Sequence, residues 1–368
     1  MSVGSEAADT GAFSVSACGP AEREEQARLF NACFKKPIDA AGLAWRYDEN
    51  PHGAAVSFVT RPRAGQAVSG YACSPRRMLV GGDETTLAAV GQTGDVMTHP
   101  EWRKRGLFSD LDRAAMAETR RRGWPLVFGL PNRRSAHIFL ELGWEQVGTV
   151  RPWCFVLHGD AEARRARSRE GRLAALLTPL AARRGRRARE RLDRAAGRYN
   201  AQWLERFPPE VLELSRATEA RHGAMVRRDA DYLNWRFAAS PSRLHRVFGL
   251  FAEGELAAYV VVQRPREGEG GGFLVDALGR DAEALDAAVG TGLRELERLG
   301  ASYVQATAVD GSSWSDVLAR AGFQPPKPDN HLIVILHVHD PAHPLVAAAR
   351  EPARWYFTDG DRDDETMG

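Results

Sequence analysis

The 368-residue sequence has few cysteines, no long apolar run and almost no net charge. Its four cysteines are scattered, without a Cys-x-x-Cys pair, which argues against a disulfide framework or a zinc site, so we expect no metal. No apolar stretch approaches the roughly 18 residues that a membrane helix needs. Residues 1–10 are acidic and polar, unlike a signal peptide, so we expect a cytoplasmic protein. The formal charge of +2 gives no overall sign of nucleic-acid or membrane binding.

Positive charge is nevertheless concentrated in one segment. Residues 162–198 contain thirteen arginines and only four acidic residues, with leucines at helical spacing. This pattern is typical of a basic helical linker with a solvated face. The alternative is peripheral contact with an anionic membrane surface through residues 161–198. Because the segment has no aromatic residues that would stack on bases, we expect no nucleic-acid partner.

Two short motifs recur in the same order and indicate an internal duplication. Trp45-Arg46-Tyr47 reappears as Trp235-Arg236-Phe237, and both copies read as helix-end anchors. Leu142-Gly143-Trp144 reappears as Ala321-Gly322-Phe323. Strand-like segments follow the first motif of each copy: residues 55–60, 70–79, 246–251 and 256–263.

This organisation predicts two domains, which also suits a chain longer than one hydrophobic core usually spans. We place the domains at residues 11–160 and 201–340. The Arg/Ala-rich linker covers residues 161–200, and a C-terminal segment with an acidic tail covers residues 341–368.

Residues 95–108, which read DVMTHPEWRKRGLF, place three cations and a glycine between a strand and an amphipathic helix. Backbone N–H groups at such a turn, with the positive end of a helix dipole behind them, bind a phosphate or pyrophosphate. The segment is neither a P-loop nor a dinucleotide fingerprint, because it lacks their glycine spacing. The second half has the acidic sequence LGRDAE over residues 278–283 instead, so we expect no pyrophosphate to bind there.

The loop resembles motif A of the GNAT superfamily of acyl-CoA N-acyltransferases, with Arg103, Gly106 and Phe108 on its marked positions. Residues 126–144 resemble motif B, in which Asn132 ends the strand that precedes the motif's helix. The resemblance implies an α/β fold with two tandem GNAT-like domains, whose mixed sheets are flanked by helices, joined by the basic linker. It also implies acetyl-CoA as co-substrate. The residues expected to bind it are Met97, Thr98, Arg103, Lys104, Arg105, Gly106, Leu107, Phe108 and Asn132.

Acyl transfer needs a neutral amine, a route for its proton and stabilisation of the oxyanion. The family commonly uses a strand carboxylate as base and a tyrosine of the motif B helix as acid, but Phe139 stands at the tyrosine position. Another donor therefore serves, or the amine's own proton reaches the thiolate, or the domain binds CoA without turnover. Asp95 and His99 are the candidate bases, with a turn residue and a loop cap as their structural alternatives. Tyr71 is a candidate acid, or else a sheet aromatic.

Asp48 and Glu49 are candidates for recognising an ammonium substrate, because the second half has alanine at both positions. A solvated helix end is the alternative. The leading function is N-acetyl transfer to a small-molecule primary amine, with amino sugars or sugar-derived amines favoured by fold analogy alone. A catalytically silent CoA-binding or assembly protein and a membrane-peripheral partner remain open. The oligomeric state, the acyl length and the acceptor do not follow from the sequence.

Overall fold

The computed structural model describes residues 13–80, 83–157, 187–219, 221–325 and 331–362. The strands of the first half are β1 (Phe13–Ala17), β2 (Val56–Pro62), β3 (Ser69–Val80), β4 (Asp83–Thr98), β5 (Leu126–Gly129) and β6 (Glu145–Val156). Its helices are η1 (Pro20–Glu22), α1 (Arg23–Cys33), α2 (Ala40–Tyr47), η2 (Pro100–Trp102), α3 (Leu107–Arg121) and α4 (Ala136–Glu141).

The second half opens with a helix over residues 187–196. Its strands are β7 (Asn200–Leu204), β8 (Ala224–Met225), β9 (His245–Ala252), β10 (Glu255–Gln263), β11 (Gly271–Gly279), β12 (Tyr303–Val309), β13 (Leu332–Val338) and β14 (Trp355–Tyr356). Its helices are α7 (Val211–Glu219), α8 (Ala230–Leu233), η3 (Asn234–Ala238), α9 (Ala282–Arg298), α10 (Ser313–Ala321), α11 (Pro344–Ala349), η4 (Pro352–Arg354) and η5 (Asp359–Asp361). The strand segments expected from the sequence are confirmed as β2, β3, β9 and β10.

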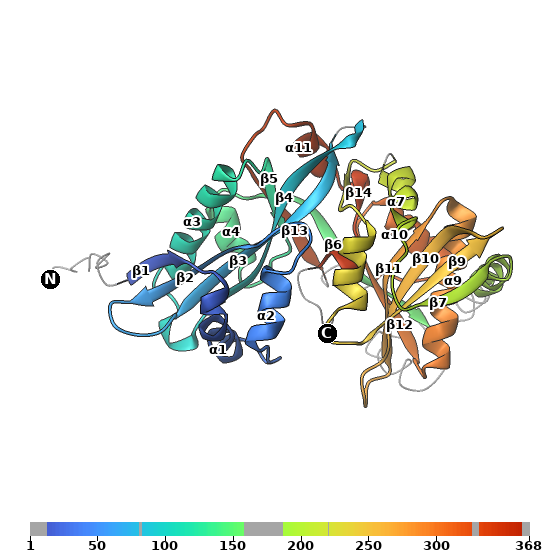
Figure 1. Cartoon of the computed structure of the whole chain (residues 1–368), viewed down its shortest axis with the longest axis horizontal. Helices are drawn as coiled ribbons and strands as arrows, with labels where there is room; N and C mark the ends of the chain where they lie inside the picture. The colour runs from blue at the N-terminus through green and yellow to red at the C-terminus, as the bar shows by residue number, and fades with distance from the viewer. Residues whose placement is uncertain (1–12, 81–82, 158–186, 220, 326–330, 363–368) are drawn as a thin grey trace, which may run out of the picture.

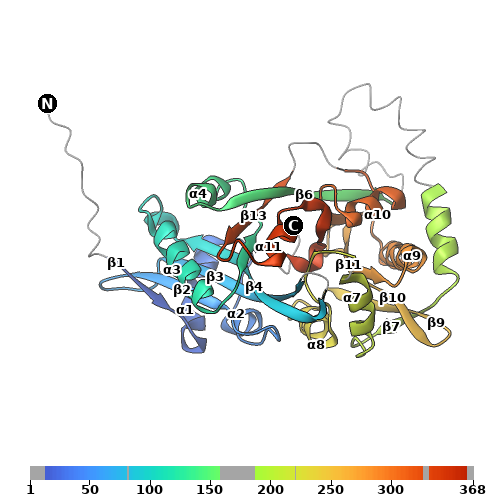
Figure 2. The same ribbon diagram turned by 90° about the horizontal axis from the view of Figure 1, so that it is seen from above.

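Twelve of these strands form one continuous sheet along the long axis of the molecule (Figure 1). Its order is β1-β2-β3-β4-β5-β13-β6-β12-β11-β10-β9-β7. The pairs β4–β5 and β11–β12 are parallel, and the other neighbouring pairs are antiparallel. Figure 2 shows α4 and the pair α1–α2 on opposite sides of the first-half strands. The expected α/β fold with mixed sheets and flanking helices is confirmed.

The two halves exchange their last strands. β13 of the second half lies between β5 and β6 of the first, and β6 in turn pairs with β12 of the second half. The exchange covers the edges of β5 and β12, which would otherwise present unpaired backbone groups. The halves therefore cannot separate without breaking strand ladders.

The duplicated tryptophans meet where the halves pack together. The rings of Trp45 and Trp235 stack with centroids 4.7 Å apart, and Trp235 Nε1 donates to the carbonyl oxygen of Trp45 at 3.0 Å. His52 and Tyr232 form a second stacked pair at 4.4 Å. All four side chains are buried, so this contact joins the first domain's core to the second.

The described part of the linker is an amphipathic helix, as expected. Over residues 187–196 it buries Leu192 and packs so closely on α9 that a Cβ on Gly290 would lie 2.6 Å from the Leu192 carbonyl oxygen. Arg189 forms an ion pair with Glu297 at 2.8 Å. Most of the segment proposed for membrane contact lies outside the described residues. Within the described residues, no helix combines the length and apolar character that crossing a bilayer requires.

Candidate active site

A cleft opens in the first half where β4 and β5 diverge. Only a short stretch of the two strands is paired: Gly91–Thr93 of β4 pair with Val127–Gly129 of β5. At the last pair they are so close that a Cβ on Gly129 would lie 2.3 Å from Thr93 Cγ2. Beyond it lies a cavity of about 550 Å³. Its lining includes aromatic and aliphatic residues from both sides of the sheet: Phe30, Phe34, Leu130, Phe139 and Leu332.

The basic loop after β4 leads into α3 with an open helix N-terminus. Gly106 adopts a left-handed conformation (φ 75°) at the N-cap, and no described side chain caps the helix. Arg103, Lys104 and Arg105 are exposed beside it. Arg103 Nε donates to the Thr98 carbonyl oxygen at 3.2 Å, and Arg105 lies over the Trp102 ring at 4.8 Å. This arrangement offers backbone N–H groups and three cations to an anion.

The corresponding helix of the second half is closed to an anion by its own side chain. Asp281 caps α9, accepting a hydrogen bond from the Ala284 backbone N–H at 2.8 Å. A carboxylate therefore takes the position that a phosphate would occupy.

The second half's strand divergence is also filled. β11 and β12 pair only over Gly271–Phe273 and Tyr303–Gln305, and η5 contacts both strands beyond this point. Asp359 of η5 accepts from the Thr307 backbone N–H at 2.6 Å, and Tyr356 donates to the Ala277 carbonyl oxygen at 2.6 Å. Only the first half therefore combines a basic helix N-terminus with an open cleft in the described structure.

Asp95 lies at a bulge of β4 beside the cleft. The β3–β4 ladder pairs Gly70 with Met97 and Ala72 with Gly94, which leaves Tyr71, Asp95 and Val96 out of register. Asp95 adopts a positive φ of 48° at this position. A bulge turns side chains and backbone groups out of the regular ladder, and here it directs them at the divergence of the strands.

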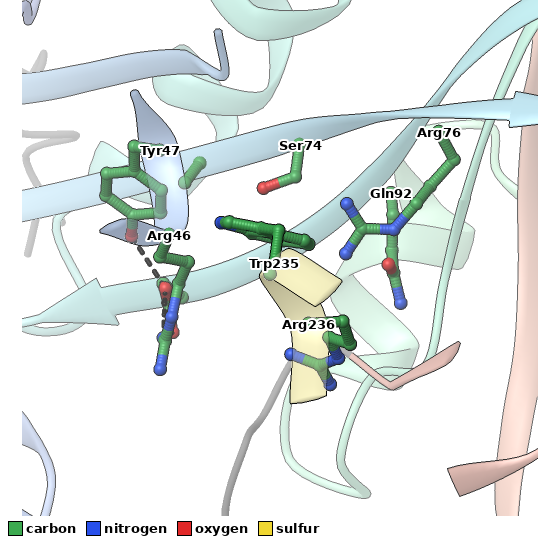
Figure 3. Close-up of a pocket in the computed structure, with 10 residues that line it drawn as sticks. Arg46, Tyr47, Ser74, Arg76, Gln92, Trp235 and Arg236 are labelled. Carbon is green, nitrogen blue, oxygen red and sulfur yellow. Dashed lines mark hydrogen bonds and ion pairs between the residues drawn. The ribbon is translucent and has the colours of Figure 1, made fainter. Parts of the chain in front are cut away.

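Two residues of the first Trp-Arg-Tyr motif hold the Asp95 carboxylate. Arg46 Nη1 lies 2.7 and 2.6 Å from its two oxygens, and the Tyr47 hydroxyl donates to it at 2.6 Å (Figure 3). Burial and, to a smaller extent, the charge of Asp95 raise the pKa of Tyr47 well above its ordinary value. Arg46 thus anchors the end of α2 to β4, as expected for a helix-end motif, and it also lines the cavity. Its position directly after a duplicated tryptophan was the available sequence signal.

The comparisons with known proteins agree with this geometry. Residues 14–147 match the family model described as acetyltransferase (GNAT) domain. The first half is a GNAT domain. No curated protein matches the chain.

Solved structures share the fold over most of the chain. A GCN5-related N-acetyltransferase from Anabaena variabilis is 13% identical, with 89% of this chain and 73% of that one covered and a TM-score of 0.60. One from Kribbella flavida is 15% identical, with 89% and 71% covered and a TM-score of 0.57. A tandem GNAT protein from the clavulanic acid biosynthesis pathway is 14% identical, with 90% and 99% covered and a TM-score of 0.54. At these identities the likeness is one of fold.

Asn132 and Phe139 bring the motif B helix of the GNAT domain to the cavity. Asn132 Oδ1 accepts from the backbone N–H groups of Arg134 and Ser135 at the start of the helix, so its amide N–H groups are the ones that can reach a ligand. Phe139 packs against Phe108, with centroids 5.0 Å apart. The part of the cavity wall formed by Phe139 is therefore an aromatic ring that has no proton to donate.

Tyr71 and His99 do not line the cavity. Tyr71 is buried under α3, where its hydroxyl donates to Asp112 at 3.0 Å. Burial and, to a smaller extent, the charge of Asp112 raise the pKa of Tyr71 well above its ordinary value. His99 begins the η2 turn, where its Nδ1 accepts from the Glu101 N–H at 3.4 Å. These positions match the structural alternatives for both residues.

Asp48 and Glu49 also lie away from the cavity. The Asp48 carboxylate accepts two hydrogen bonds from the buried Arg23, at 2.9 Å from Nε and 2.6 Å from Nη2. Glu49 is exposed at the end of α2. Neither carboxylate is therefore placed to receive an ammonium group in the cleft.

The remaining residues expected to bind the co-substrate lie along β4 and the first turn of α3. Met97 is buried against α1, and its carbonyl oxygen accepts from Ser69 Oγ at 2.8 Å. Leu107 is buried, which anchors the start of α3 in the core. Their side chains thus fix the strand end and the helix start, while the backbone between them remains the part that a ligand can contact.

Proposed function

We propose that the chain is an acyl-CoA-dependent N-acyltransferase that transfers an acetyl group to a primary amine. One juxtaposition carries this proposal: the uncapped, basic N-terminus of α3 follows directly from the strand that diverges at the cavity. The loop suits a pyrophosphate. The unpaired edge of β4 beyond Thr93 suits the amides of the pantetheine arm, which would add to it as a strand does.

The chemistry requires no separate acid. The amine nitrogen forms a bond to the thioester carbonyl carbon, and the carbon–sulfur bond breaks. The nitrogen loses one proton and the thiolate gains one, so the proton balance closes between the reactants. In the described lining Asp95 is the only carboxylate, and we propose it as the group that receives and passes on this proton. We assign no catalytic role to His99 and Tyr71, because neither lines the cavity.

A catalytically silent CoA-binding protein is the second candidate, and Phe139 favours it. Phe139, which lines the cavity at the tyrosine position of motif B, gives the departing thiolate no hydrogen-bond donor. Binding without turnover would follow if the proton could not pass directly between amine and thiolate.

Calorimetry with acetyl-CoA tests the site. Gly106→Asp gives α3 a carboxylate comparable to the one that Asp281 gives α9, and Arg103→Glu reverses a neighbouring charge. We expect each variant to weaken acetyl-CoA binding by about tenfold or more, since a carboxylate at this position repels the pyrophosphate. The matched control is Arg113→Glu, which reverses an exposed charge on the same helix outside the loop. Equal affinities in all four proteins would overturn the proposed site.

Release of free thiol from acetyl-CoA with a panel of primary amines, amino sugars included, separates the two candidates. Turnover of any amine, abolished by Gly106→Asp, establishes the enzyme. Binding of acetyl-CoA without turnover of any amine establishes the silent protein.

A further inference from the structure

The wall of the cavity on the side of α1 is aromatic. Phe30 lies in the last turn of α1 and Phe34 at its C-cap, and their rings are in contact with centroids 4.5 Å apart. Phe30 is buried in a cluster with Leu29 and Met97, whereas Phe34 is 38% exposed. Four large apolar side chains of the described residues are exposed to this degree, and Phe34 is the one of them that lines the cavity. An apolar ring is thus held open to the cavity by a buried ring behind it.

Apolar surface continues across the cavity from this wall. Leu130 follows β5, Phe139 comes from α4, and Leu332 begins β13 of the second half. Lys35 and Lys36 are among the polar residues that complete the lining. Single apolar residues at a surface are ordinary, but an apolar lining with polar residues around it is typical of a ligand site.

The cavity extends from one face of the sheet to the other. Tyr71 and Ala72 are consecutive in β3, and their side chains belong to separate cores on the two faces. Tyr71 packs with residues of α3 and α4, and Ala72 packs with residues of α1 and α2. Figure 2 shows α4 and the pair α1–α2 on opposite sides of these strands. Phe139 and Phe34 therefore line opposite ends of the cavity.

The two ends suit the two substrates of the proposed reaction. The basic loop leads into α3, and Phe108 of α3 packs against Phe139 of α4, so the proposed acyl-CoA would enter from their face of the sheet. The end beside α1 is then left for the acceptor. Arg46 connects this end to the proposed proton acceptor, because its guanidinium lies over the Phe30 ring at 5.9 Å and pairs with Asp95 at 2.6 Å.

We propose that the acceptor is a primary amine carrying an aromatic or other large apolar group, and that Phe34 determines this specificity by packing against that group. The inference rests on the proposed function, because it names the acceptor of that reaction. Contact between two rings, together with removal of their apolar surface from water, favours such an amine. An amino sugar would instead place hydroxyl groups against the Phe34 ring, which offers them no hydrogen bond.

Matched amine pairs test the acceptor class. Each pair differs in the ring alone: phenylbutylamine with butylamine, and phenylethylamine with ethylamine. The full-length protein is assayed by thiol release from acetyl-CoA, and the same amines are titrated calorimetrically against the CoA-bound protein, so that binding reports the preference even without turnover. We expect about a tenfold or greater preference for the aromatic member of at least one pair. Equal values within both pairs, or a preference for glucosamine included alongside, would overturn the inference.

Variants of Phe34 test the residue. Phe34→Ala should raise KM or Kd for the aromatic amine by about tenfold and leave those for its alkyl partner and for acetyl-CoA unchanged, and Phe34→Tyr should retain most of the preference. Leu140→Ala is the matched control, because Leu140 is 40% exposed on α4 and lies outside the cavity lining. An equal loss for both members of a pair would assign Phe34 a structural role and refute its role in specificity.

A comparison of hexanoyl-CoA with acetyl-CoA, with butylamine as acceptor, shows whether the apolar wall serves the acyl group instead. A preference for hexanoyl-CoA that disappears in Phe34→Ala would overturn the assignment to the acceptor. The proposed function fails separately, if acetyl-CoA neither binds nor is consumed with any amine.

Discussion

Asp112 offers a test of the core beneath the basic loop over residues 99–106, through the variant Asp112→Asn. This carboxyl group is buried on the inner face of α3, where it accepts from the Tyr71 hydroxyl at 3.0 Å and from Trp144 Nε1 at 3.3 Å. Burial raises the pKa of Asp112 to about 6, and the two hydrogen bonds only partly oppose the shift. No cation of the described chain forms an ion pair with it.

The sign and size of the effect follow from linkage. A carboxyl group whose pKa is higher in the folded than in the unfolded state stabilises the fold below the unfolded value, and this contribution is lost as the pH rises through the folded value. The window for Asp112 is therefore about pH 4 to 6, and a shift of about two units corresponds to about 3 kcal/mol. Asparagine carries no charge at any pH but loses one acceptor, which costs about 1 kcal/mol.

We therefore expect Asp112→Asn to be more stable than the natural protein by about 2 kcal/mol at pH 8 and less stable by about 1 kcal/mol at pH 4. Urea unfolding at both values measures this crossover. Asp110→Asn is the control, because Asp110 is an exposed carboxylate on the same helix. A difference that is the same at both pH values would refute the reasoning.

Two further predictions concern buried contacts, the first within the second half and the second between the halves. Arg228→Met should destabilise the fold by about 3–5 kcal/mol in urea, because it leaves the buried carboxylates of Asp276 and Asp361 without their cation. Arg298→Met, at an exposed ion pair, should change stability by less than about 0.5 kcal/mol, and equal effects would contradict the prediction. Trp235→Ala should cost about 3–5 kcal/mol by removing the stack on Trp45, whereas Trp203→Ala, at a side chain 61% exposed, should cost little.

Several features of the chain could be predicted because their signals are local in the sequence. Three cations and a glycine before an amphipathic helix indicate the loop over residues 99–106, and the structure shows an uncapped helix N-terminus there. The acidic sequence of the second half predicted a counterpart that binds no pyrophosphate, and in the structure Asp281 caps the helix at that position. Both depend on residues within a few positions of one another.

Side-chain partners across the fold could not be predicted in the same way. Asp95 was a candidate from its place near a strand end, but the bulge that turns it toward Arg46 depends on the β3–β4 register. Tyr71 was selected as a candidate acid although its side chain faces α3, and no periodicity indicated Asp112 as its partner. Asp48 pairs with Arg23, 25 positions away, which removes it from the cleft.

The sequence by itself determined the duplication, the basic loop before α3 and the half of the chain that carries it, because these motifs and charges lie in consecutive residues. Tertiary structure alone decided the exchange of β6 and β13 and the filling of the second half's cleft by η5. It also decided that Arg362 of the second half lines the cavity of the first half. Those features depend on strand pairing and on burial between segments that lie from 52 to 269 residues apart in the sequence. Such pairing is selected by the free energy of the whole fold and leaves no pattern in either segment.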